Sequence, residues 1–129
     1  MIASVLLRTV LPGESGQAVH WGVPMLAERV SVTQAFLLEF VLTFLLVTAV
    51  WGTAVDERAP RIGGFGIGLT VTMAILVAGP LTGAALNPAR AFGAACASGV
   101  WADHLVYWIA PLLGGAAAAR LYKSIVLRP

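Results

Sequence analysis

Few polar residues in this sequence could do chemistry, and two of them, Asn87 and Arg90, lie in residues 83–93, which read GAALNPARAFG. Asn87 followed by Pro88 indicates a helix start. The Asn side chain accepts a hydrogen bond from a backbone N–H, and Pro fits the first helical position, where an N–H would have no partner. The helix that follows is expected to run two to three turns, whereas crossing a bilayer takes about 20 residues. Such a helix must be buried in protein or line a water-filled cavity.

Glu39 is the one carboxylate within a long apolar stretch, AFLLEFVLTFLLVTAVWGTAV. A charge inside a membrane span costs about 2.5–3.5 kcal/mol on insertion scales, so we expect Glu39 to face other helices and to accept hydrogen bonds. The alternative is a carboxylate close enough to the helix end to reach the interface. Glu39 lies about one turn inside the expected span and is followed at once by Phe40 and Val41, which favours the buried interpretation.

The remaining reactive side chains suggest neither catalysis nor a metal site. The single cysteine, Cys96, excludes an internal disulfide and a cysteine-based metal centre, and its alanine neighbours favour a packing role. His20 is a lone histidine in a mixed loop. No constellation of acids, bases and nucleophiles converges in the apolar segments, so we expect no enzyme, no cofactor and no bound metal. Basic patches with interleaved aromatic residues are also missing, which argues against a nucleic-acid partner.

The composition indicates an integral membrane protein. Hydrophobic residues make up 59% of the 129 residues and charged residues 11%, against about 25% charged in soluble domains. The start, MIASVLLRTVLP, has no small-residue cleavage site and is a poor signal peptide. It reads instead as the last turns of a spanning helix.

Apolar stretches separated by breaking residues predict an all-α membrane fold with three transmembrane helices and one re-entrant half-helix. Pro12-Gly13, the charged turn 56–61 and Gly79-Pro80 are the main breaks. Residues 1–129 form one unit. Its expected parts are the end of a preceding helix (1–11), an extracellular loop (12–33), spans at 34–55, 62–79 and 104–126, and the re-entrant loop with its half-helix (80–98).

The distribution of Lys and Arg predicts the orientation. If three spans alternate, one side carries five basic residues and the other three, and the richer side is expected in the cytoplasm. The chain is therefore predicted to be a multi-pass protein of the cell membrane with a cytoplasmic C-terminus. The five residues are Arg58, Arg61, Arg120, Lys123 and Arg128, and the three are Arg8, Arg29 and Arg90.

Together these residues resemble the second half of the aquaporin (major intrinsic protein) family. The resemblance covers about residues 34–126, and residues 1–11 fit the end of the family's third helix. The motifs that carry it are Asn87-Pro88-Ala89-Arg90, the preceding Thr82-Gly83, the following Phe92-Gly93, Glu39, and the Trp108, Pro111 and Gly114-Gly115 pattern.

The resemblance implies roles for these residues. The half-helix would enter the membrane from outside, with the NPA motif of Asn87, Pro88 and Ala89 at the pore centre. Asn87 would turn its NH₂ toward passing water, and Ala89 would serve packing. Arg90 would be the fixed charge of the outer constriction, its alternative being a surface arginine that reaches the interface. Glu39 would hold the re-entrant loop by accepting from its backbone N–H groups.

Counting back from Asn87, the resemblance places Ile75 and Ala84 at the constriction. Animal water channels typically have His at the first position, so Ile75 leaves a more apolar site. Ala91 replaces the Asp that follows the motif in glycerol channels, and the pair Tyr107-Trp108 is typical of water channels. Water is therefore the expected substrate, and small neutral solutes such as glycerol remain further candidate substrates.

The family's pore needs two inverted repeats, and this sequence has a single NPA motif. Either the chain is part of a longer channel or it needs partner chains to supply the first repeat. A channel subunit or fragment in the lipid bilayer is the leading function, with a homotetramer expected from the resemblance. The alternative is a non-conducting truncated remnant, or an assembly partner of full-length homologues.

Overall fold

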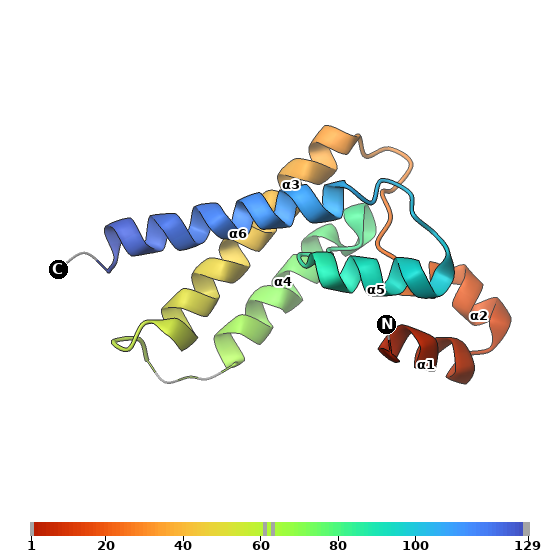
Figure 1. Cartoon of the computed structure of the whole chain (residues 1–129), viewed down its shortest axis with the longest axis horizontal. Helices are drawn as coiled ribbons and strands as arrows, with labels where there is room; N and C mark the ends of the chain where they lie inside the picture. Colours follow the sequence, from red (N-terminus) through yellow and green to blue (C-terminus); the bar gives the residue numbers. More distant parts are fainter. Residues whose placement is uncertain (1, 61, 63, 128–129) are drawn as a thin grey trace.

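The computed structural model describes residues 2–60, 62 and 64–127, and every regular element in this part of the chain is helical, as predicted. Figure 1 shows the arrangement, in which α3 crosses α6 and also packs on α4, while α5 lies against α1 and α6. The elements are α1 (Ile2–Val10), α2 (Gly13–Ala18), a 3₁₀ turn η1 (His20–Gly22), α3 (Val32–Val50), a π-helical turn η2 (Trp51–Val55), α4 (Phe65–Thr82), α5 (Pro88–Ser98) and α6 (Val106–Ile125).

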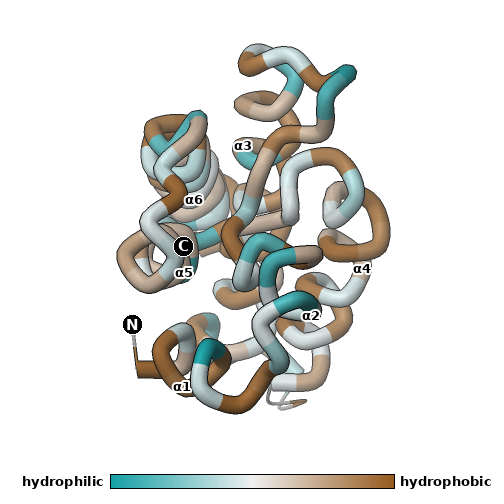
Figure 2. Tube along the Cα trace, turned by 90° about the vertical axis from the view of Figure 1, so that its right-hand side faces the viewer, coloured by the Kyte–Doolittle hydropathy of each residue, from teal (hydrophilic) through white to brown (hydrophobic). Residues whose placement is uncertain are grey.

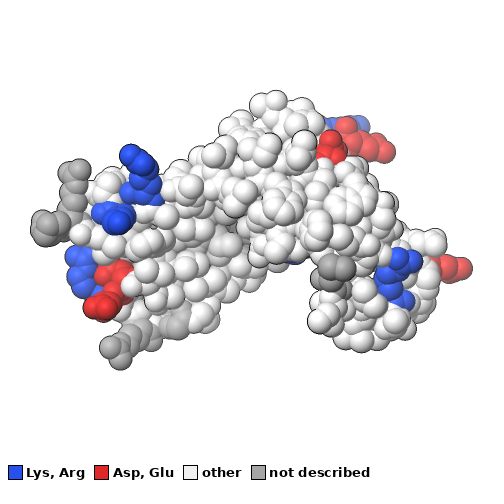
Figure 3. Space-filling view, viewed as in Figure 1, with Lys and Arg blue, Asp and Glu red and all other residues white. Residues whose placement is uncertain are grey.

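Two of the described helices are long and apolar enough to cross a membrane, Val32–Val55 and Phe65–Thr82. Charged side chains on the face in Figure 3 gather at the two ends of the molecule, with a broad uncharged band between them. Figure 2 shows hydrophobic positions along α1 and α4 and hydrophilic ones in α2. The third predicted span corresponds to α6, which carries Arg120 and Lys123 near its end, and its crossing of the membrane stays a prediction.

The long helix α3 begins at Val32, two residues before the expected start at 34, and Ser31 forms a capping box. Ser31 Oγ accepts from the Gln34 N–H at 3.3 Å, and Gln34 Oε1 accepts from the Ser31 N–H at 2.9 Å. These two reciprocal bonds satisfy N–H groups that a helix start otherwise leaves without partners. They fix where the span enters the bundle.

The helix α4 runs three residues beyond the expected end at Gly79. Pro80 lies inside its last turn, where the missing N–H costs one intrahelical bond but does not stop the chain from continuing. Gly83, with φ of 80°, ends the helix and donates its N–H to the Gly79 carbonyl at 3.1 Å. A Cβ at Gly83 would lie 2.7 Å from Pro24 Cα, so glycine is also needed for close approach of the preceding loop.

The predicted loop 12–33 contains the short helix α2 and the turn η1. The Trp21 ring lies directly on Gly16, where a Cβ would be 2.1 Å from the ring. Arg8 of α1 stacks on the same Trp21 ring, with its guanidinium 5.3 Å from the ring centroid. Arg8 also donates a hydrogen bond to the Ala97 carbonyl of α5. The two contacts of Arg8 have no local sequence pattern, and they tie α1 to this segment and to α5.

A polar cluster connects the end of α3 to the end of α6. Arg58 Nε and Nη2 donate to the two carboxylate oxygens of Asp56, each at 3.0 Å. Arg58 Nη2 also donates to the Val126 carbonyl at 2.8 Å. The Tyr122 hydroxyl donates to Asp56 Oδ2 at 3.1 Å. The bonds from Arg58 lower the pKa of Asp56 to about 2, so the carboxylate remains charged at any physiological pH. Arg61 and Arg128, which entered the orientation argument, lie outside the described residues.

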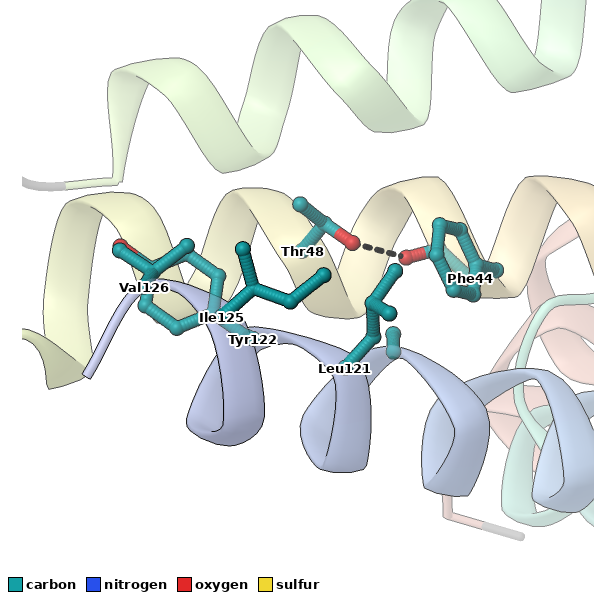
Figure 4. A pocket seen from close by; sticks show the side chains of 7 residues that line it. Phe44, Thr48, Leu121, Tyr122, Ile125 and Val126 are labelled. Atoms are coloured by element: carbon teal, nitrogen blue, oxygen red, sulfur yellow. Dashed lines mark hydrogen bonds between the residues drawn. The ribbon is translucent and has the colours of Figure 1, made fainter. Parts of the chain in front are cut away.

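Just inside this cluster, α3 and α6 leave an apolar pocket of about 160 Å³ between them (Figure 4). Of the two hydroxyl-bearing side chains that line it, Thr48 donates to the Phe44 carbonyl of its own helix at 2.8 Å and Tyr122 donates to Asp56. The pocket therefore presents a hydrocarbon surface. Its lining residues are Phe44, Thr48, Ala118, Leu121, Tyr122, Ile125 and Val126.

Nearer the middle, α3 and α6 touch through their backbones at Gly114. A Cβ there would lie 2.3 Å from the Phe40 carbonyl oxygen, whereas one at Gly115 would meet Val47 at 3.4 Å. Glycine at such a crossing lets two helices approach closely, which is how small residues drive association in membranes.

We expect Gly114→Ala to destabilise the helix pair by about 1–3 kcal/mol, because the methyl group forces the two backbones apart. Gly68→Ala on α4 is the matched control, since a Cβ there meets nothing within 4 Å, and helix propensity favours it by up to about 1 kcal/mol. Denaturant titration in detergent, followed by circular dichroism, measures both. Equal stability of the two variants would contradict the close crossing.

Candidate functional site

The candidate site is the loop of residues 83–87 that joins α4 to α5, together with the buried carboxylate beneath it. Glu39 has no exposed surface in this structure. Its Oε1 accepts from the Thr82 hydroxyl at 2.7 Å and from the Ala85 N–H at 2.9 Å, and its Oε2 accepts from the Leu86 N–H at 2.7 Å. A buried carboxylate with three donors within 2.9 Å is well compensated for its loss of hydration.

The backbone of this loop adopts conformations that are unusual for L-residues. Gly83, Ala84 and Leu86 have φ values of 80°, 43° and 54°. Left-handed conformations at non-glycine residues cost about 1–3 kcal/mol each and persist only when the surroundings enforce them. Here they turn successive N–H groups to one side: Thr82 Oγ1 accepts from the Ala84 N–H at 3.2 Å, and Glu39 accepts from the next two.

The carbonyl groups of the same peptides point the other way. In a trans peptide the C=O and N–H are antiparallel, so N–H groups held by Glu39 and Thr82 direct the carbonyls of Gly83, Ala84 and Ala85 away from them. No donor among the described residues reaches these three oxygens. The loop therefore presents a row of free acceptors on the face opposite to Glu39.

At the end of this row Asn87 begins the helix α5. Its Oδ1 accepts from the N–H groups of Ala89 at 2.9 Å and Arg90 at 3.4 Å, and Pro88 occupies the first helical position. The side-chain oxygen is thus engaged, while the amide NH₂ has no acceptor within the described part of the chain. The eleven residues of α5 span about 16 Å, and the positive end of their dipole lies at Asn87.

The structure places the other residues predicted for the site in different environments. Arg90 is exposed on the first turn of α5. Ile75 is 49% exposed and flanks the buried face of α4 formed by Ala74 and Ala78. Ala84 is buried in a cluster with Leu42, Ala74, Ala78 and Leu86. Its methyl group therefore faces the core, and its backbone carbonyl is the group that remains available on the open side.

Sequence reasoning missed two side chains at the site. The hydroxyl of Thr82 was assigned no role, although it both donates to Glu39 and accepts from the loop. Tyr107, considered only as one of an aromatic pair, is fully buried and donates its hydroxyl to the Thr82 carbonyl at 2.9 Å. These contacts join residues 25 and 43 positions apart, so no local pattern could have indicated them.

An aromatic cluster packs the middle of α5 against the start of α6. The Phe92 ring lies 5.8 Å from Trp101 and 6.1 Å from Trp108, both edge to face, and His104 lies 4.8 Å from Trp101. Edge-to-face aromatic pairs contribute about 0.5–1.5 kcal/mol beyond burial. The bond from Arg8 to the Ala97 carbonyl holds the C-terminal end of α5, and Asn87 caps its N-terminal end.

This geometry defines an all-helical membrane protein in which a buried carboxylate organises an irregular loop leading into a short capped helix. Comparison with known proteins then gives the family. The model of the major intrinsic protein family matches residues 1–122, and the chain belongs to that family.

The relatives are aquaporins. Aquaporin TIP4-4 of Zea mays is 43% identical over 98% of this chain and 49% of its own length, and aquaporin TIP4-1 of Arabidopsis thaliana is 41% identical over 97% and 50%. Aquaporin A of Dictyostelium discoideum is 41% identical over 84% of this chain and 40% of its own length. The chain thus spans about half the length of the curated relatives it matches.

We expect Glu39→Leu to destabilise the loop strongly and Glu39→Gln only mildly. Leu leaves two buried N–H groups without acceptors, at about 1–3 kcal/mol each, whereas the Gln amide keeps one oxygen to accept. Thermal unfolding in detergent compares the two, and Glu28→Gln, an exposed position, is the control. A Leu variant as stable as the control would show that the loop does not depend on Glu39.

Proposed function

We propose that the chain forms one half of a passive water channel, with residues 83–90 lining the path. The observation that carries the proposal is the row of free carbonyls at Gly83, Ala84 and Ala85 next to the unengaged NH₂ of Asn87. Polar backbone inside a membrane is tolerated where it lines a water-filled cavity. A water molecule can donate to these carbonyls and accept from the Asn87 NH₂. Glu39 holds the loop from the opposite face by accepting from its N–H groups.

Charge at the same place favours neutral permeants. The positive end of α5 at Asn87 raises the energy of a cation or proton there, as half-helix dipoles do in selective pores. Arg90, exposed on the first turn of α5, adds a permanent cation and several donors. In this proposal Arg90 narrows the outer constriction, and Pro88 and Ala89 complete the motif as the rigid first turn of the half-helix.

The proposed topology has α3, α4 and α6 spanning the membrane and α5 re-entering from outside with the loop. Residues 12–33 then lie outside and the C-terminus in the cytoplasm of a multi-pass membrane protein. The relatives are about twice as long, so the opposite pore wall would come from a facing repeat of similar size. A homotetramer of complete channels in the lipid bilayer is the proposed assembly.

The proposed permeant is water, with small neutral solutes such as glycerol as further candidates. Ile75 offers no donor at the constriction and is half exposed beside the buried face of α4. Ala91, fully buried and packed with Tyr107, replaces a carboxylate that would sit at this position in glycerol channels. This combination supports a path that is apolar on one side and hydrogen-bonding on the other.

Reconstitution tests the proposal directly. We expect this chain alone to give liposomes no water permeability above empty vesicles, because the free carbonyls and Asn87 would face lipid at several kcal/mol per group. Joined to the preceding half of the Zea mays relative, it should conduct water with a low activation energy in stopped-flow assays. A joined protein that assembles but stays impermeable would favour the alternative of a non-conducting assembly partner.

In the joined protein, we expect Arg90→Ala to admit larger solutes and to weaken exclusion of cations. Removing the side chain both opens space and deletes a fixed positive charge. Stopped-flow measurements of water, urea and proton flux give the readout, and Arg29→Ala, an exposed arginine of the preceding loop, is the control. Identical selectivity in the two variants would remove Arg90 from the constriction.

Placing a donor at Ile75 should discriminate between permeants. We expect Ile75→His to reduce glycerol flux more than water flux, because the ring fills the constriction while its N–H can replace a hydrogen bond of water. Leu76→His is the matched control on the outer side of α4, where the side chain is 76% exposed. An equal effect on both fluxes, or none, would place Ile75 away from the path.

A further inference from the structure

We propose that Thr82 and Tyr107 are positioning residues that set the solute cutoff of the pore by fixing the direction of the loop carbonyls. The inference rests on the proposed function, because a cutoff exists only if the loop lines a path. Its structural basis is a continuous chain of buried hydrogen bonds from Tyr107 through Thr82 to Glu39 and the loop.

Thr82 uses its hydroxyl in both directions. The proton goes to Glu39 Oε1 at 2.7 Å, since the other acceptor within reach, the Ala78 carbonyl, is at 3.4 Å. The hydroxyl oxygen accepts from the Ala84 N–H at 3.2 Å. Thr82 thereby satisfies the first N–H of the loop and also orients the carboxylate that satisfies the next two.

Tyr107 holds the same residue through its backbone. The Thr82 carbonyl lies at the C-terminal end of α4, where a continuing helix would supply the N–H of Leu86. That N–H is bound to Glu39 instead, so the carbonyl would have no partner without the Tyr107 hydroxyl at 2.9 Å. The Tyr107 ring also packs with Ala85 of the loop and Ala91 of α5, both buried.

The connection to the path runs through Gly83. Its φ of 80° is a conformation from which a glycine backbone rotates readily, and its carbonyl is the first of the free acceptors. With Thr82 held by its side chain and its carbonyl, the peptide planes that follow have fixed directions. Losing either contact would let the carbonyls of Gly83 and Ala84 swing and the path widen, which favours larger solutes over water.

The test uses the joined protein and four variants. Thr82→Val removes the hydroxyl at nearly constant shape, Thr82→Ser retains it, and Tyr107→Phe removes only the phenolic oxygen. Thr72→Val on the same helix is the control, because within the described part of the chain the Thr72 hydroxyl bonds only to the Gly68 carbonyl of its own helix, at 2.9 Å. Two quantities are measured for each variant: amide hydrogen exchange at Ala84–Leu86, and the ratio of glycerol to water permeability.

We expect Thr82→Val and Tyr107→Phe to accelerate exchange of the loop amides about tenfold or more and to raise the glycerol-to-water ratio, since each leaves a buried partner unsatisfied. Thr82→Ser and Thr72→Val should match the parent in both. Faster exchange with an unchanged permeability ratio would reduce the two residues to a structural role and overturn the inference. If the joined protein without substitutions conducts no water, the proposed function is wrong. Independently of that result, unchanged amide exchange at Ala84–Leu86 in Thr82→Val would show that Thr82 does not position the loop.

Discussion

The buried carboxylate of Glu39 is the interaction on which the rest of the site depends. A charge with no exposed surface is tolerable only if donors replace its lost hydration, and here the donors are the Thr82 hydroxyl and the N–H groups of Ala85 and Leu86. Those bonds force left-handed conformations on Ala84 and Leu86, which the chain would otherwise avoid. The three hydrogen bonds of Glu39 thus offset both the cost of burying the charge and the strain of the loop.

The directions of the loop carbonyls and of α5 both follow from this arrangement. Because the N–H groups are held on one side, the carbonyls lie on the other, and the chain emerges from Leu86 with Asn87 in an extended conformation suited to an N-cap. The helix α5 can be short because tertiary contacts fix it, the Phe92 aromatic cluster at its middle and the Arg8 bond to Ala97 at its far end. A short helix with one capped end and one tethered end keeps its dipole pointed at a fixed place.

The sequence alone predicts the all-helical class and the start of α5 at Asn87, because both depend on residues close together in the chain. It also predicts an internal position for Glu39, because a charge in an apolar span is costly. Other features depended on distant partners. The continuation of α4 through Pro80 ends where Gly83 meets Pro24, and residues 12–33 contact α1 through Arg8, which stacks on Trp21. Ala84 could be aligned to a pore position, but the side its methyl group faces is decided by a φ value that sequence does not show.

Within the proposed pore, donors and acceptors are separated along the chain, and this separation has a consequence for protons. Residues 83–85 present backbone acceptors, whereas the Asn87 NH₂, the positive end of α5 and Arg90 present donors or positive charge. A water molecule at Asn87 must turn its oxygen toward the donor, which leaves its hydrogens for neighbouring waters or carbonyls. A proton moving along a file of water needs each oxygen to accept from the previous molecule, and at Asn87 that oxygen is already engaged. In the proposed pore, the hydrogen bonds that would let water pass the loop would therefore also interrupt proton transfer, as long as Glu39 keeps the loop carbonyls on the side opposite to its own.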